Sequence, residues 1–180
     1  MFKDEILENK RRREVYSFIK ANPGIHQREL QRNLKMPLAS LEYHLQYMKR
    51  RKIVYEEKDG NYSRYYCSPL EPEDKRILVA LRHGKLREIV LLVLVRKKVK
   101  YEDIAESFKL PRSTIYLYLK HLVDNGIIEG TKVGYETFYA VKDEDRIAKI
   151  LLAYKSSFLD RLVDSATSVW LDTRFGEKKP

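Results

Sequence analysis

The stretch MPLASLEYHLQYMKRRK, residues 36–52, predicts a helix with two different faces. At 100° per residue, Leu41, Leu45 and Met48 lie within about 60° of one another and are expected to face a core. The opposite face is polar and carries Ala39, Ser40, Tyr43, Gln46, Tyr47 and Arg50. Such a helix packs on one side and leaves the other open to a partner.

The same helix is written a second time, 74 residues later, as LPRSTIYLYLKHLVDNG, residues 110–126. Leu41 corresponds to Ile115 and Leu45 to Leu119, and the apolar match extends from Val15/Ile89 to Tyr65/Tyr139 without a gap. Apolar positions agree while most surface residues differ. This pattern indicates a duplicated fold with diverged surfaces.

Each copy predicts helices followed by a β-hairpin. In the first copy we expect helices at 4–21, 26–34 and 37–51 and strands at 53–57 and 62–68. In the second copy we expect helices at 73–81, 86–97, 101–108 and 111–125 and strands at 127–130 and 135–141. Two helices joined by a short turn, with a hairpin after them, form a winged helix-turn-helix. The fold class is therefore mainly α with small β-hairpin wings (α+β), in two tandem winged helix-turn-helix domains followed by a C-terminal amphipathic segment.

The domain boundaries follow from the repeat and from two prolines, Pro69 and Pro72, which hold the chain extended between the copies. We expect a first domain at 1–68, a linker at 69–72, a second domain at 73–141, one or two C-terminal helices at 142–174 and a disordered tail at 175–180.

The formal net charge of +10 is concentrated in the two copies. Residues 1–68 hold 15 Lys and Arg against 9 Asp and Glu, residues 72–141 hold 13 against 9, and residues 142–180 hold 8 against 7. A polyanion such as nucleic acid is the partner that this distribution favours, and solubility alone is the alternative.

Several classes are disfavoured by what the sequence lacks. One cysteine and four unclustered histidines predict neither a disulfide framework nor a structural metal, and the sequence holds no glycine-rich phosphate loop. We therefore expect no enzymatic activity and no cofactor. With no signal-peptide pattern and no long apolar run, a cytoplasmic location is expected.

The outward face of the first repeated helix suits a DNA major groove. Ala39 and Ser40 permit close approach, and Gln46 can bond an adenine edge through two hydrogen bonds. The face also offers Tyr43 and Tyr47, and Lys49 and Arg50, with Arg51 and Lys52 after them, are candidate phosphate contacts. The wing adds Lys58, Asn61 and Arg64. An ordinary solvated face with a basic end, favoured by the helix dipole, is the alternative.

The second repeated helix is less suited to DNA, since Leu117 and Asp124 replace Tyr43 and Arg50. Its remaining candidates for DNA contact are Arg112, Ser113, Thr114, Tyr116 and Lys120, with Lys132 in the wing. Whether this copy contacts DNA or a protein stays open.

The C-terminal segment carries an apolar stripe at three- and four-residue steps. We expect dimerisation through Leu151, Tyr154, Phe158, Leu162, Val169 and Trp170, which would match a two-fold symmetric operator. The alternative is that the stripe only covers the second domain.

NPGIHQREL followed by LEYHL and a tyrosine-rich hairpin resembles archaeal winged helix-turn-helix regulators, and is similar more loosely to bacterial regulators of the ArsR and MarR types. The resemblance covers residues 13–68 and 87–141, and implies a dimeric DNA-binding transcription regulator. His44 matches a position often filled by histidine in the family, where we expect a packed or backbone-bonded side chain in preference to a base contact. Two departures are Lys52, where glycine usually follows the recognition helix (Gly126 in the second copy), and Met36 or Leu110 in place of a small polar residue.

These observations favour a transcription regulator that binds double-stranded DNA as a homodimer, with the basal transcription machinery as a further candidate partner. A tandem winged-helix adaptor in a chromosome-partition or transcription-initiation assembly is the alternative, supported by the outward Leu117. RNA binding has no aromatic RNA-binding motif behind it.

Overall fold

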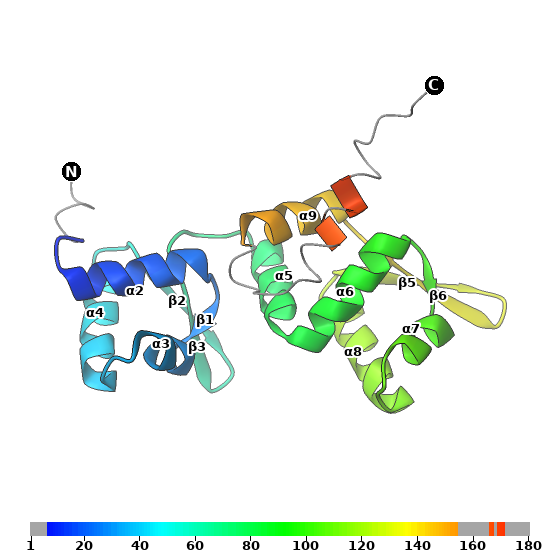
Figure 1. The fold of residues 1–180 in the computed structure, drawn as a ribbon, viewed down its shortest axis with the longest axis horizontal. Coiled ribbons are helices and arrows are strands. Elements are labelled where there is room, and N and C mark those ends of the chain that lie inside the picture. Colours follow the sequence, from blue (N-terminus) through cyan, green and yellow to red (C-terminus); the bar gives the residue numbers. More distant parts are fainter. Residues whose placement is uncertain (1–6, 155–165, 168, 172–180) are drawn as a thin grey trace, which may run out of the picture. The chain divides into compact units, whose positions relative to one another are not determined.

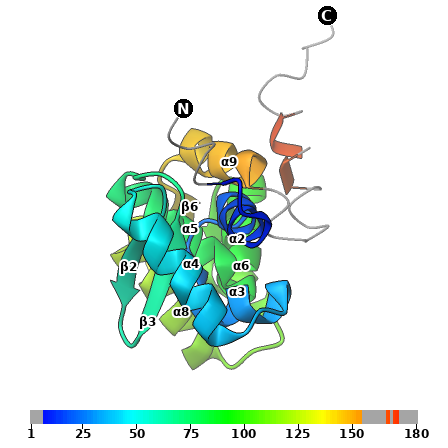
Figure 2. The ribbon, with the colours of Figure 1, turned by 90° about the vertical axis from the view of Figure 1, so that its left-hand side faces the viewer.

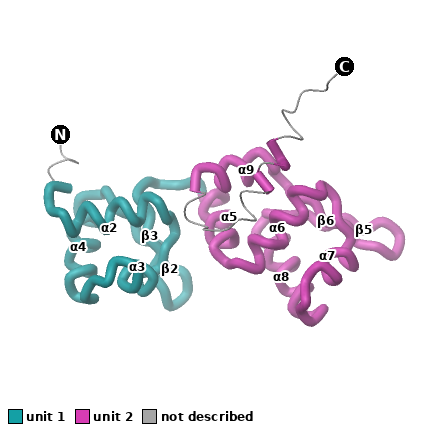
Figure 3. The backbone as a smooth tube through the Cα atoms, viewed as in Figure 1, with its two compact units in different colours: residues 1–71 teal, residues 72–180 magenta. Residues whose placement is uncertain are grey.

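The computed structural model describes residues 7–154, 166–167 and 169–171 and divides the chain into two compact units, Met1–Glu71 and Pro72–Pro180 (Figure 3). Each unit holds one copy of the repeat, so each is described by itself. None of the helices in the described part is long and apolar enough to cross a membrane.

In its described residues, the first unit has three helices and a three-stranded sheet (Figure 1). Its elements are α2 (Lys10–Ala21), β1 (Ile25–His26), α3 (Gln27–Leu34), α4 (Leu38–Arg50), β2 (Tyr55–Asp59) and β3 (Tyr62–Tyr66). The helix expected over 4–21 is observed as α2 from Lys10, where the Asn9 side chain accepts a hydrogen bond from the Arg12 backbone N–H and caps it; residues 4–6 lie outside the described residues. The turn into α4 needs Lys35 in the left-handed region, at φ 48°.

The second unit repeats this order and adds a helix at each end (Figure 1). Its elements are α5 (Pro72–Arg82), α6 (Gly84–Arg96), β4 (Val99–Lys100), α7 (Tyr101–Ser107), α8 (Arg112–Asp124), β5 (Ile128–Val133), β6 (Glu136–Val141) and α9 (Glu144–Ala153). Pro72, expected in the linker, is the first residue of α5, a position where its missing N–H costs nothing.

Each wing is part of a three-stranded antiparallel sheet, whereas the sequence predicted a two-stranded hairpin. The order is β1-β3-β2 in the first unit and β4-β6-β5 in the second, with Ile25 opposite Tyr65 and Val99 opposite Tyr139. A strand of two residues is too short to show an alternating pattern, so β1 and β4 were missed. They tie the base of each wing to the segment before the helix-turn-helix.

The core positions of the repeat are buried in both units. Leu41, Leu45 and Met48 of α4 are at most 2% exposed, and Ile115 and Leu119 of α8 are at most 1% exposed. Arg51 and Lys52 end α4, and Lys52 takes a left-handed φ of 56° where Gly126 has 67° after α8. Lys52 therefore replaces the usual glycine without changing the backbone conformation. A residue with a side chain is modestly strained in this left-handed region.

Candidate nucleic-acid interface

The α4 helix presents a continuous polar stripe to solvent, opposite its core residues. Ala39, Tyr43 and Gln46 are exposed, with Tyr43 at 62%, and Ser40 is half-buried beside them. Figure 2 turns the first unit toward the viewer and shows α4 across its front, with β2 and β3 to one side of it. These four residues of the predicted outward face therefore lie together on one open surface.

Three cations that the sequence reading did not select lie beside the start of this stripe. Arg28, Arg32 and Lys35 come from α3 and its C-cap, and together with Met36 and Pro37 they line a shallow groove. Among the residues that the structure describes, Arg32 and Lys35 have no hydrogen bond or ion pair from their side chains, and Arg28 approaches only the Tyr62 ring, at 5.9 Å. Unpaired cations next to a groove-facing helix are suited to phosphate oxygens. Arg28, Arg32 and Lys35 are spaced four and three residues apart, which places them on one face of α3. This spacing is the sequence signal from which they could have been predicted.

Tyr47 is covered by two guanidinium groups. The Arg12 guanidinium of α2 lies 3.7 Å from the centroid of the Tyr47 ring, and the Arg51 guanidinium lies 5.5 Å from it. Contacts of this kind stabilise a cation over an aromatic face. Tyr47 thus packs against Arg12 of α2, which covers one face of its ring within the unit.

Lys49, a predicted phosphate contact, forms an ion pair with Glu56 of β2, and both side chains are less than a third exposed. Burial alone would raise the pKa of Glu56. Hydrogen bonds from Lys49 and Ser63, together with the nearby charge of Lys58, instead hold this pKa below its usual value. The pair connects the recognition helix to the wing. Arg50, by contrast, is exposed and has no partner in the described residues.

The wing keeps two of its three predicted contacts at the surface. Asn61 is exposed beside Gly60 in the turn. The Lys58 ammonium lies 3.1 Å from Ser63 Oγ and 3.7 Å from the Glu56 carboxylate, with its side chain 77% exposed. Arg64 is different, because its guanidinium donates to Asp59 at 2.6 Å and to the Gly24 carbonyl at 2.9 Å and is mostly buried. It holds the hairpin to the loop before β1.

His44 is buried beside the stripe, 6% exposed, and packs edge-on against Tyr43. Burial and the charges of Arg12 and Arg11 lower its pKa below the ordinary value of 6.5. It packs as expected and does not reach the open face.

In the second unit, one of the three cations predicted to contact DNA is paired with an acid. Lys120 lies 2.7 Å from Asp124 on α8, and another cation, Lys100 of β4, lies 2.6 Å from Glu136. Leu117 and Tyr116 are 61% and 55% exposed at the centre of the outward face. Arg112, Ser113 and Lys132 are exposed, and Thr114 is half-buried. The second recognition helix therefore offers an apolar centre with few free cations.

The described part of the C-terminal stripe packs largely within the second unit. Leu151 is fully buried and Trp170 is 6% exposed, while Val169 is 41% exposed and Tyr154 is half-buried. Phe158 and Leu162, the other residues expected at a dimer interface, lie outside the described residues. Burial of Leu151 and Trp170 fits the alternative that this stripe covers the second domain. No group of three potential metal ligands occurs in the described part of the chain.

The chain contains two winged helix-turn-helix units, and the recognition helix of the first has an open polar face. These features define the class of a DNA-binding regulator. The comparisons agree with this class. Residues 9–78 match a family described as "N-terminal HTH domain", and residues 88–144 match the family "Sugar-specific transcriptional regulator TrmB". The chain is similar to archaeal winged helix-turn-helix transcription regulators, and the resemblance stated from its motifs is confirmed.

Similar proteins extend this result. The chain is 28% identical over 140 residues to an "Uncharacterized HTH-type transcriptional regulator" of Methanocaldococcus jannaschii, a match that covers 78% of this chain and 35% of that protein. The chain thus spans about a third of that relative's length. A crystal structure of an ArsR family transcriptional regulator matches 63% of this chain and all of its own, with 20% identity and a TM-score of 0.35. The family matched by residues 88–144 and the archaeal relative are both described as transcriptional regulators.

Proposed function

We propose that the first unit reads double-stranded DNA with α4 in the major groove. The open stripe of Ala39, Ser40, Tyr43 and Gln46 supports base-edge contacts, because it combines small residues with an amide and an aromatic ring. This stripe, flanked by free cations, is the observation that carries the proposal. The matched families support transcription regulation as the setting.

Backbone phosphates are held on both sides of the stripe. Arg28, Arg32 and Lys35 flank the start of α4, and Lys58 and Asn61 extend from the wing. Lys49 and Arg64 act within the unit and position the wing, since each bonds a carboxylate and is largely buried, whereas the side chain of Lys58, 3.7 Å from Glu56, stays 77% exposed. Phosphate contacts fix the register, while Gln46 discriminates among bases.

The test adds a carboxylate to the groove-facing stripe. Ser40→Glu should abolish enrichment of a sequence motif from a pool of random duplexes at moderate salt, because the new charge faces the negative potential of the groove. Ser17→Glu adds the same charge to an exposed position of α2 and is the matched control. If the parent enriches no motif, or Ser40→Glu enriches the same motif as Ser17→Glu, α4 does not read DNA.

A protein-binding role for the second unit is the second candidate. Leu117 and Tyr116 leave an apolar centre on α8, and Lys120 is paired with Asp124. Such a face fits a protein surface better than a polyanion. In this proposal the second unit contacts a partner of the transcription machinery, or a second copy of the chain, while the first unit holds DNA. Sedimentation of the full chain over a concentration series tests the homodimer.

A further inference from the structure

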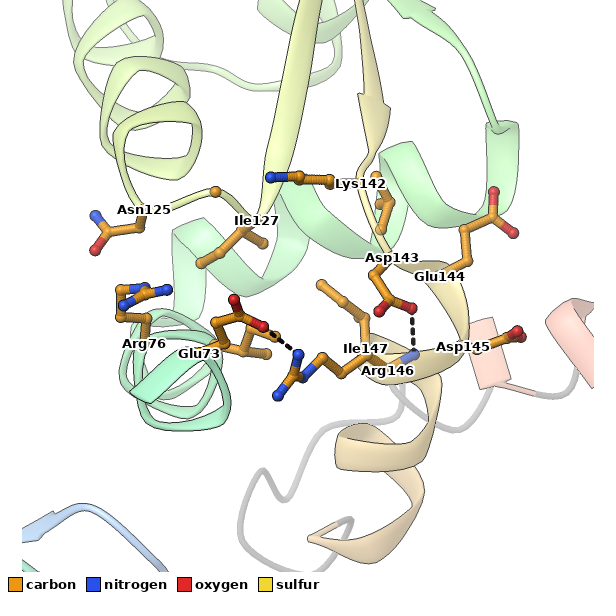
Figure 4. A pocket seen from close by; sticks show the side chains of 13 residues that line it. Glu73, Arg76, Asn125, Ile127, Lys142, Asp143, Glu144, Asp145, Arg146 and Ile147 are labelled. Atoms are coloured by element: carbon orange, nitrogen blue, oxygen red, sulfur yellow. Dashed lines mark hydrogen bonds and ion pairs between the residues drawn. The ribbon is translucent and has the colours of Figure 1, made fainter. Parts of the chain in front are cut away.

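A polar pocket lies within the second unit, away from the outward face of α8. It has a volume of about 600 Å³ and is lined by α5, by the turn between α8 and β5, and by the junction of β6 with α9. Figure 4 shows Arg76 and Asn125 on one side, and Lys142 extending from the end of β6 toward that side. This volume is in the range of pockets that hold small molecules.

The carboxylates of this pocket are already engaged by groups of the chain. Arg146 forms ion pairs with Glu73 and with Asp74, the latter at 2.6 Å. Asp143 accepts a hydrogen bond from the Arg146 backbone N–H at 2.9 Å, as the N-cap of α9. Glu144 lies 2.5 Å from Lys97. Glu73, Asp143 and Glu144 therefore have donors within the unit, and Asp145, the fourth carboxylate that lines the pocket, is not without a partner either.

Two cations of the same pocket have no such partners. Neither the Arg76 guanidinium nor the Lys142 ammonium forms a hydrogen bond or an ion pair with a residue that the structure describes, and both side chains are exposed. Lys142 uses only its backbone N–H, which donates to the Ile127 carbonyl. The charged groups left to meet a ligand are thus mainly positive, although the pocket as a whole contains acids and bases.

From this imbalance we propose that the pocket binds a small organic dianion, with Arg76 and Lys142 as its two charge partners. An Arg guanidinium can bond a carboxylate or phosphate through two parallel hydrogen bonds, and Lys supplies a second positive charge. The Glu73–Arg146 pair in the same lining is satisfied and acts as a polar wall. This site is independent of the DNA surface, because it uses no residue of α4 or of the outward face of α8.

The location of the pocket gives its ligand access to three elements at once. Asn125, Gly126 and Ile127 join α8 to the wing strand β5, while Val141 and Lys142 join β6 to α9. A bound dianion would bridge α5 to the connection between recognition helix and wing. A ligand that binds one arrangement of these elements better than another shifts their populations.

Three compounds of similar length test the site, with the full chain observed by amide nuclear magnetic resonance. Succinate carries two negative charges, succinamide has the same carbon chain without charge, and 1,4-diaminobutane carries two positive charges. We expect succinate to give saturable shifts at residues 125–127 and 142–147, with succinamide and diaminobutane binding at least about tenfold more weakly.

Variants then assign the charges. Arg76→Gln and Lys142→Gln should each weaken succinate binding by about tenfold or more, while Lys132→Gln, an exposed cation of the same unit's wing, should leave it unchanged. All three side chains are exposed, so the midpoint of unfolding should be the same in each variant as in the parent. Failure of succinate to saturate, equal binding of diaminobutane, or full affinity in Lys142→Gln would each overturn the proposal. None of these results depends on DNA binding by the first unit.

Discussion

The two recognition helices share their buried side and differ in their open side. α4 and α8 place apolar residues at matching positions, all at most 2% exposed, in units with the same order of helices and strands. On the open side, α4 presents Tyr43 and Gln46, whereas α8 presents Leu117 and a Lys120 that is tied to Asp124. The core of a duplicated fold is constrained by packing, while its surface is free to acquire another partner.

The largest expected effect is the one that both units share. Leu45→Ala and Leu119→Ala remove equivalent buried side chains, so each should lower the free energy of unfolding of its unit by about 2–5 kcal/mol. Urea unfolding measures this, with circular dichroism reporting both units and the fluorescence of Trp170 reporting the second. Leu117→Ala is the control, since truncation of a largely exposed side chain should change stability by less than about 0.5 kcal/mol. A negligible cost for Leu119→Ala would mean that the second core is packed differently from the first.

A smaller effect should separate the two open faces. Gln46→Ala should lower the affinity for the selected duplex by about 1–3 kcal/mol and reduce discrimination at one base pair, because a base-edge contact is lost. Its counterpart Lys120→Ala should bind DNA like the parent, since Lys120 already has an acidic partner on α8. Fluorescence anisotropy with the selected duplex and its single-base variants measures both changes.

Salt dependence distinguishes base contacts from phosphate contacts in the same series. Arg32→Gln should weaken binding to all sequences and reduce the slope of log affinity against log salt by about one. Gln46→Ala should leave that slope unchanged. If Lys120→Ala weakens binding as much as Gln46→Ala, the second unit also reads DNA and the contrast between the faces fails.

The sequence predicted the fold more completely than the interface, for physical reasons. Buried residues recur with the period of the helix, so the spacing of Leu41, Leu45 and Met48 predicted which face of α4 is buried. The internal repeat predicted the second unit. The prediction was weakest where structure depends on contacts between distant segments. Lys49 and Arg64 looked like free cations in sequence, but Lys49 pairs with Glu56 of the wing, and Arg64 pairs with Asp59 of the neighbouring strand.

Other features were missed because nothing local marks them. Strands β1 and β4 have two residues each and exist through pairing with β3 and β6. Arg12 covers Tyr47 from another helix, 35 positions away in sequence. At Lys52, by contrast, the sequence departs from the family pattern but the backbone does not, since Lys52 keeps the left-handed turn with φ at 56°. Whether the assigned residues bind DNA stays a prediction.

The smallest expected effect concerns pH and should distinguish the first unit through two histidines. Burial and neighbouring Arg12 and Arg11 lower the pKa of His44, while burial and Arg64 lower the pKa of His26, both from 6.5. A lowered folded pKa means that the unfolded chain binds the proton more tightly. The free energy of unfolding should therefore be at its highest above pH 6.5 and should fall as the pH drops below 6.5.

His44→Gln should flatten this loss between pH 7 and 5, since the neutral amide cannot take up the proton that the buried site disfavours. The window excludes Glu56, whose lowered pKa affects stability only below its ordinary value of 4.5. Urea midpoints of the circular dichroism change, taken against pH for parent and variant, measure the difference, and His26 accounts for the slope that remains. A parent whose midpoint rises on acidification would contradict the positive environment that Arg12 and Arg11 give to His44, and with it the packing of α2 against the end of α4.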